Sequence, residues 1–145
     1  MGRVIILLIG EYEHSIDQKG RINFPTKLLE DLGEKFIITK GLDNCLFVYS
    51  YEEWKLIENK IKALPMSKTR NLQRFLFSSA AEISSDKQGR IVIPKNLRDY
   101  ADLSKNVIIT GVSVRCEIWD RDRYNKMNEE ITPEEIESAM EDLGF

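Results

Sequence analysis

The hydrophobic and polar positions at the start of the chain alternate as they do in a strand with one buried face. From Glu11 onward the polar residues alternate with Tyr12, His14 and Ile16, and this period of two is typical of a half-buried strand. Before it, Val4–Ile9 is a run of six apolar residues, far short of the roughly twenty that span a bilayer. The run predicts a strand that enters the core.

The strand pattern is interrupted by a phrase typical of a tight reversal. In Asp17–Gly20 the aspartate can accept backbone hydrogen bonds two residues on, and the glycine can adopt positive φ without a Cβ penalty. A strand resumes over Arg21–Phe24. Pro25 is suited to open a short helix over Thr26–Leu32, which Gly33 ends.

The same reading continues to the end of the chain. Further strands are predicted at Phe36–Thr39, Cys45–Tyr49, Glu82–Ser85, Arg90–Ile93, Val107–Thr110 and Arg115–Trp119. Further helices are predicted over Tyr51–Leu64 behind a Ser50–Glu53 capping box, over Ser67–Ser78, from Pro94, from Asp120, and from Thr132 to about Gly144.

The order of elements repeats because the sequence does. Ser15–Leu28 and Ser84–Leu97 are identical at seven of fourteen positions, where ordinary residue usage predicts about one. The register extends past an insertion, so that Phe36–Thr39 matches Val107–Thr110 and Cys45 matches Cys116. The chain is therefore an internal duplication of about forty-five residues per copy.

Units this small bury too little apolar surface to fold alone, so the two copies should complete one core around a pseudo-two-fold axis. The predicted fold class is α+β, with a β-rich core and added helices. The predicted organisation is one unit at 11–53, helices at 54–81, a second unit at 82–125 and an acidic helix at 126–145.

Charge is divided unevenly along the chain. The formal net charge is −3, but residues 129–145 hold seven acidic residues and no lysine or arginine, so the rest of the chain carries +4. A mildly basic body can present a basic face to nucleic acid even when the whole protein is acidic.

The two cysteines, Cys45 and Cys116, have no spacing typical of a zinc site or a secreted disulfide framework. At equivalent strand positions, both are predicted to pack in the core, with a bridge between them disfavoured in a reducing compartment. No export signal is seen, and we expect a cytoplasmic protein.

Arg21 and Arg90 follow the turn glycine in each copy and are the leading candidates for function. One interpretation is structural: each arginine pairs with the aspartate four positions back, Asp17 or Asp86, and locks the turn. The other is that two guanidinium groups on one face of a pseudo-symmetric body contact phosphates or guanine edges. Lys19 and Lys87 add charge at the turns, and Gly20 and Gly89 shape them.

Other basic residues are secondary candidates, because solvated helix faces explain most such charges: Lys27, Lys68, Arg70, Arg74, Lys95 and Arg98. His14 is the sole histidine and matches Ile83, which favours a packing role over chemistry. No catalytic constellation, metal-ligand cluster or phosphate-binding glycine loop is found, so neither an enzyme nor a cofactor is predicted.

The residues from Glu11 to Pro25, with their Asp-Gln-Lys-Gly-Arg phrase, and Asp86 to Pro94 resemble the MraZ family of bacterial transcriptional regulators, within the AbrB-like (SpoVT-AbrB) superfamily. The resemblance runs from about Gly10 to at least Tyr124 and implies a double-split β-barrel made of two tandem half-units. On this resemblance Met1–Leu7 is an extension.

The resemblance also implies ring-shaped homo-oligomers that bind short direct repeats of double-stranded DNA. The target is the promoter of the cell-division and cell-wall gene cluster, which such regulators usually repress, their own gene included. By the same resemblance Arg21 and Arg90 bind DNA, with Asp17 and Asp86 as their partners.

The sequence therefore predicts a DNA-binding repressor associated with the nucleoid. The alternative is an oligomeric protein-interaction scaffold that docks partners through its helices and acidic tail.

Overall fold

Eight strands and six helices make up residues 7–145, the part of the chain that the computed structural model describes. The first copy forms β1 (Leu8–Ser15), β2 (Arg21–Asn23), α1 (Thr26–Leu32), β3 (Lys35–Lys40) and β4 (Leu46–Ser50). The second forms β5 (Ala81–Ser84), β6 (Arg90–Val92), α4 (Lys95–Tyr100), β7 (Asn106–Ser113) and β8 (Cys116–Asp120). The copies are followed by α2 (Tyr51–Lys62) and α3 (Met66–Phe77), and by α5 (Arg121–Glu130) and α6 (Pro133–Asp142).

The elements agree with those that the hydrophobic pattern predicts, with ends shifted by one to three residues in most cases. The predicted strand at Val4–Ile9 lies partly outside the described residues, and only Leu8 and Ile9 of it belong to β1. Of the predicted extension at Met1–Leu7, only Leu7 belongs to the described residues, so this interpretation also lies outside them.

The two copies exchange strands. All strand pairs are antiparallel, and the six-stranded sheet has the order β1-β7-β8-β4-β3-β5. The first strand of each copy therefore pairs with the third strand of the other copy, and the second strands, β2 and β6, pair with each other in a separate ribbon. Neither copy has a complete sheet of its own, which confirms the prediction of one shared α+β fold.

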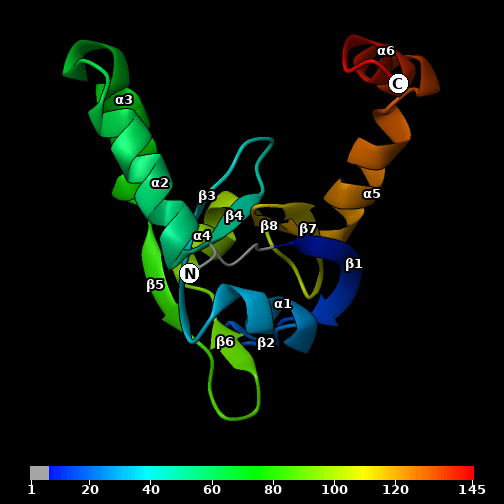
Figure 1. Ribbon diagram of the computed structural model, residues 1–145. Coiled ribbons are helices and arrows are strands. Elements are labelled where there is room, and N and C mark those ends of the chain that lie inside the picture. Colours follow the sequence, from blue (N-terminus) through cyan, green and yellow to red (C-terminus); the bar gives the residue numbers. More distant parts are fainter. Residues whose placement is uncertain (1–6) are drawn as a thin grey trace.

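The larger of two buried apolar clusters lies between the sheet and the ribbon. Ile22 and Ile91 face inward from the ribbon and are 2% and 1% exposed. They belong to the same buried cluster as Phe36 of β3 and Ile109 of β7, on the inner face of the sheet. Figure 1 shows the strands of the sheet curving toward the β2–β6 ribbon, an arrangement like the double-split barrel that the resemblance implies.

The outer face of the sheet carries α2, α3 and α5, whereas α1 and α4 bury Leu28, Leu32 and Leu97 in the inner core. A second cluster packs Trp54 of α2 and Trp119 of β8 against Phe47 and Ile108 of the sheet. From there two helical arms, α2–α3 and α5–α6, project away from the ribbon and diverge, with the C-terminus at the tip of the second arm (Figure 1). Ser50 and Asp120 cap the first helix of each arm through their side chains.

The cysteines are both buried and unpaired, but their predicted equivalence is wrong by one residue. β4 and β8 pair with each other around Phe47 and Glu117, which are directly opposite and therefore equivalent in the two copies. The residue that precedes each of them is Leu46 in β4 and Cys116 in β8, so Cys116 is equivalent to Leu46 and not to Cys45. The turn before β8 is one residue shorter than the turn before β4. Since side chains alternate between the faces of a strand, this difference places Cys45 in the outer cluster and Cys116 in the inner core.

Two reciprocal backbone hydrogen bonds join the copies beside the ribbon. Phe24 N donates to Gly89 O, and Ile93 N donates to Gly20 O, each over 2.9 Å. Each glycine has positive φ, +81° for Gly20 and +79° for Gly89, a conformation that strains any residue with a Cβ. We call these two hydrogen bonds the joint between the copies. Each turn glycine therefore has two roles, because it shapes its own turn and accepts a hydrogen bond of the joint.

The surroundings of these glycines predict unequal costs of substitution. A Cβ on Gly20 would lie 3.0 Å from Ile93 O and 2.9 Å from the Arg98 guanidinium carbon, whereas a Cβ on Gly89 meets only a Leu29 methyl at 3.7 Å. Gly89→Ala should lower the free energy of unfolding by about 1–2 kcal/mol through backbone strain alone. Gly20→Ala should cost about 1 kcal/mol more, because it also disturbs the joint. Urea denaturation measures both.

Gly33→Ala is the control for backbone strain without a steric contact, because Gly33 also has positive φ, +89°, but no heavy atom within 4 Å of the added Cβ. Its ψ of −179° is a conformation that is nearly restricted to glycine, so its alanine variant should lose stability through the backbone alone. Equal losses for Gly20→Ala and Gly89→Ala would contradict the asymmetry.

Candidate nucleic-acid interface

The outer face of the ribbon presents four side chains. Arg21 lies opposite Val92, and Asn23 lies opposite Arg90, on either side of the inward pair Ile22 and Ile91. Because residues directly opposite in an antiparallel pair point to the same face, Arg21, Asn23, Arg90 and Val92 all point away from the core. The register thus makes the two arginines diagonal neighbours on one face.

The first turn holds its arginine through one carboxylate. Asp17 Oδ1 accepts the backbone N–H groups of Lys19 and Arg21, each over 2.9 Å. Asp17 Oδ2 accepts Arg21 Nε over 2.8 Å. The aspartate therefore closes the turn and orients the guanidinium group at the same time.

The second turn repeats the arrangement. Asp86 Oδ1 accepts the backbone N–H groups of Gln88 and Arg90, and Asp86 Oδ2 accepts Arg90 Nε, all over 2.9 Å. The backbone hydrogen bond from the arginine is the main cause that lowers the pKa of each aspartate below its ordinary value of 3.8. Because the pKa of each aspartate is lower in the folded than in the unfolded protein, the ionised carboxylates stabilise the fold at a pH above the unfolded-state pKa. This contribution is lost as the pH falls through the folded-state pKa.

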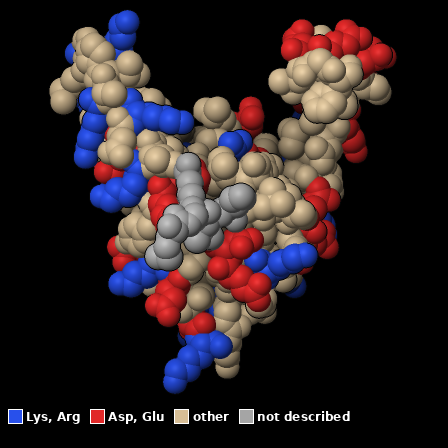
Figure 2. All heavy atoms as spheres, in the orientation of Figure 1, with Lys and Arg blue, Asp and Glu red and all other residues tan. Residues whose placement is uncertain are grey.

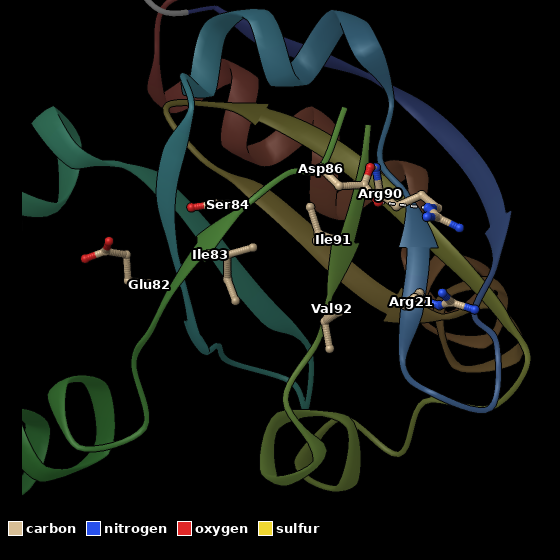
Figure 3. A pocket seen from close by; sticks show the side chains of 8 residues that line it. All are labelled: Arg21, Glu82, Ile83, Ser84, Asp86, Arg90, Ile91 and Val92. Atoms are coloured by element: carbon tan, nitrogen blue, oxygen red, sulfur yellow. Dashed lines mark hydrogen bonds and ion pairs between the residues drawn. The ribbon is translucent and has the colours of Figure 1, made fainter. Parts of the chain in front are cut away.

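The structural interpretation of the arginines holds, but it uses only part of each side chain. Within residues 7–145, the side chains of Arg21 and Arg90 form their hydrogen bonds through Nε alone. The side chains are 38% and 36% exposed. Figure 3 shows both guanidinium groups extending in the same direction. The terminal NH₂ groups are therefore presented together, on a face held rigid by the turns.

A shallow hollow lies beside the arginines, between β5 and β6. It is lined by Arg21, Glu82, Ile83, Ser84, Asp86, Arg90, Ile91 and Val92, and Figure 3 shows these side chains. The acidic residues that line it, Glu82 and Asp86, disfavour an anion inside the hollow. The cationic groups that an anion can reach are the guanidinium groups of Arg21 and Arg90, at the edge of the hollow (Figure 3).

The other basic candidates lie in several places. Lys19 and Lys87 are exposed at the tips of the turns, so the structure brings all four proposed DNA-binding residues to the ribbon and its turns. Lys95 forms an exposed ion pair with Asp99. Lys68, Arg70 and Arg74 lie on α3, in the arm that projects away from the ribbon (Figure 1).

Arg98 makes the two turns unequal. Its Nε donates to Ile93 O over 2.9 Å, and its guanidinium group packs against Gly20. The matching position in the first copy is Leu29, whose methyl group faces Gly89. A guanidinium group therefore supports the first turn where a leucine supports the second.

The ribbon positions Asn23 and Val92 were not singled out by sequence reasoning. Val92 is 51% exposed and Asn23 is exposed as well. The sequence did contain a signal for them, because side chains alternate between the two faces of a strand. With Ile22 and Ile91 facing inward, the residues before and after each isoleucine share the outward face, so Asn23 and Val92 join the arginines.

Within residues 7–145 no three histidine, cysteine, aspartate or glutamate side chains gather as a metal site requires. None of the helices in the same range has the length and apolar character needed to cross a bilayer.

Comparison with known proteins places the chain in a family. The model of the family described as "MraZ protein" matches twice, at residues 7–75 and 76–143. Proteins named "Transcriptional regulator MraZ" are similar over 96% of this chain and 100% of their own length. They include those of Alkaliphilus metalliredigens (51% identical), Thermoanaerobacter sp. (52%) and Acetivibrio thermocellus (51%).

The two tandem matches agree with the duplicated turns and exchanged strands, and the relatives are named as regulators rather than as enzymes. The chain belongs to the MraZ family of transcriptional regulators.

Proposed function

We propose that this protein binds double-stranded DNA in a sequence-specific manner through the outer face of the β2–β6 ribbon. The observation that carries the proposal is the pair of guanidinium groups, Arg21 and Arg90, held by Asp17 and Asp86 on one exposed face. A two-stranded antiparallel ribbon has the dimensions to enter the major groove. Arginine there forms bidentate hydrogen bonds with the O6 and N7 atoms of guanine.

The carboxylates contribute preorganisation. An arginine whose Nε is already bound loses less side-chain freedom when its terminal NH₂ groups contact a base or a phosphate. Lys19 and Lys87, at the turn tips, are placed to contact phosphates on either side of the bases. Such contacts add affinity and salt dependence rather than sequence preference.

Family membership supports the finer part of the proposal. We infer that the DNA targets are direct repeats in the promoter of the cell-division and cell-wall gene cluster, and that binding represses the cluster and this protein's own gene. In this role the protein is associated with the nucleoid.

We further propose that copies of the chain assemble head to tail into a ring through the helical arms. Lysine and arginine gather on the α2–α3 arm, and aspartate and glutamate gather on α6 (Figure 2). Apolar side chains on both arms are exposed: Leu64, Met66, Leu72, Ile136, Met140, Leu143 and Phe145. An acidic apolar surface on one copy is complementary to a basic apolar surface on the next.

Such a contact joins two different surfaces, so it generates a ring when the rotation between copies closes. A ring would present several ribbons to successive repeats. Avidity then rises by about 10² to 10⁴ when the spacing of the sites fits.

The double variant Arg21→Lys/Arg90→Lys tests the DNA interface, because it keeps the charge but removes the planar fork. Each substitution should cost about 1–3 kcal/mol of binding to the target duplex. Binding to a scrambled duplex of equal length should change little, because phosphate contacts depend on charge. Fluorescence anisotropy at fixed salt, with DNA from upstream of the protein's own gene, measures both.

The matched control is Arg121→Lys/Arg123→Lys, which keeps the charge but removes two planar guanidinium groups of similar exposure, 38% and 40%, at the start of α5 and away from the ribbon. This control should leave target binding near that of the unaltered protein. The proposal fails if the arginine-to-lysine variant still prefers the target duplex as strongly as the unaltered protein does.

The second candidate function, a protein-interaction scaffold, is favoured by the exposed apolar side chains of the arms. Salt distinguishes the two functions. DNA affinity should fall steeply as salt rises, because bound counterions are released, whereas apolar docking should respond weakly. A chain without salt-dependent DNA binding would favour the scaffold.

Charge reversal tests the arms. Glu137→Lys/Glu141→Lys on α6 and Arg70→Glu/Arg74→Glu on α3 should each lower the oligomer mass by placing like charges at the contact. Light scattering of the purified protein measures the mass. The four substitutions combined should restore the oligomer, and a monomeric unaltered protein would refute the assembly.

A further inference from the structure

The ribbon follows two-fold symmetry except at one pair of outward positions. The pseudo-axis that relates the copies exchanges Arg21 with Arg90 and Ile22 with Ile91, which are identical residues. It also exchanges Asn23 with Val92, which differ in chemistry. The ribbon therefore carries two matching arginines and one mismatched pair.

The mismatched pair lies where it can contact a ligand of the arginines. Asn23 is directly opposite Arg90, and Val92 is directly opposite Arg21. Both lie on exposed ribbon positions, with 51% of Val92 accessible, and no side-chain hydrogen bond of Asn23 is found within residues 7–145. Figure 3 shows Val92 on β6, among the residues that line the hollow beside the two arginines.

The two side chains recognise different bases. An asparagine amide can donate to N7 and accept from the N6 amino group of adenine in the major groove. Valine has no hydrogen-bonding group, and its methyl groups suit the C5-methyl group of thymine. Each arginine is thus accompanied by a neighbour that prefers a different base.

We propose that Asn23 and Val92 determine the direction in which one chain reads its DNA site. A ribbon with exact two-fold symmetry reads a site equally well in either orientation. With adenine preferred beside one arginine and thymine beside the other, one orientation binds more tightly. The inference rests on the proposed DNA binding and concerns the orientation of that binding.

Other differences between the copies lie outside the base-reading face. Gln18–Lys19 in the first turn corresponds to Lys87–Gln88 in the second, and Arg98 corresponds to Leu29. Charged groups at the turns are positioned for phosphates, which carry no sequence information directly. The ribbon pair is therefore the difference that can specify bases.

Two substitutions that make the ribbon symmetric test the proposal. Val92→Asn gives two asparagines, and Asn23→Val gives two valines. Full-length protein and each variant are used to select duplexes from a pool with a randomised centre, and the bound DNA is sequenced. Thermal unfolding checks that each variant folds, which we expect because both positions are exposed.

The unaltered protein should select a motif that differs from its own reverse complement. Val92→Asn should select a palindromic motif with adenine beside both arginine positions, and Asn23→Val should select one with thymine beside both. Replacing the adenine that Asn23 contacts should weaken binding by unaltered protein about 5- to 100-fold. The same replacement should have a much smaller effect on Asn23→Val.

The outcomes separate the two proposals. If the unaltered protein selects a palindrome, or if both variants select the same asymmetric motif as the unaltered protein, the inference is overturned while DNA binding stands. If the unaltered protein selects no motif at all, the proposed function fails and the inference fails with it.

Discussion

The strand exchange between the two copies is the constraint on which the rest of the structure depends. Each first strand pairs with the third strand of the other copy, and the second strands pair with each other. The backbone N–H groups of Phe24 and Ile93 donate to the turn glycines of the opposite copy. Since a buried backbone group without a partner is costly, neither half can keep its turn in place without the other.

This exchange places the two arginines on a single surface. Within one copy, an Asp-x-x-x-Arg turn is a local arrangement that orients one guanidinium group. The pairing of β2 with β6 then makes Arg21 and Arg90 diagonal neighbours, and the inward pair Ile22 and Ile91 anchors the ribbon to the core. The proposed DNA-binding face is therefore a product of the joint between copies.

The same pseudo-symmetry leaves differences that the proposed functions use. The arms occupy matching places on the outer face of the sheet, but one is basic and the other acidic at its tip (Figure 2). The ribbon has matching arginines but unlike neighbours in Asn23 and Val92. A fused duplication can vary each half separately, which a homodimer of identical units cannot do.

Much of this protein was determined by the sequence alone, because the signals are local. The alternation from Glu11 to Ile16, the Asp17–Gly20 turn and the glycine after α1 predict their elements correctly. The duplicated phrase, read with the family resemblance, also identifies the candidate arginines. Local hydrogen bonds and side-chain periodicity act over a few residues, so they can be read from the chain directly.

Only the tertiary structure decided how these elements meet. Strand exchange depends on pairing between residues far apart in the chain, and the one-residue difference before β8 separated Cys45 from Cys116 although their sequence contexts match. The outward places of Asn23 and Val92 and the packing of Arg98 against Gly20 likewise follow from register. Register is set by the whole core, since a slip of one residue moves every side chain of a strand to the opposite face.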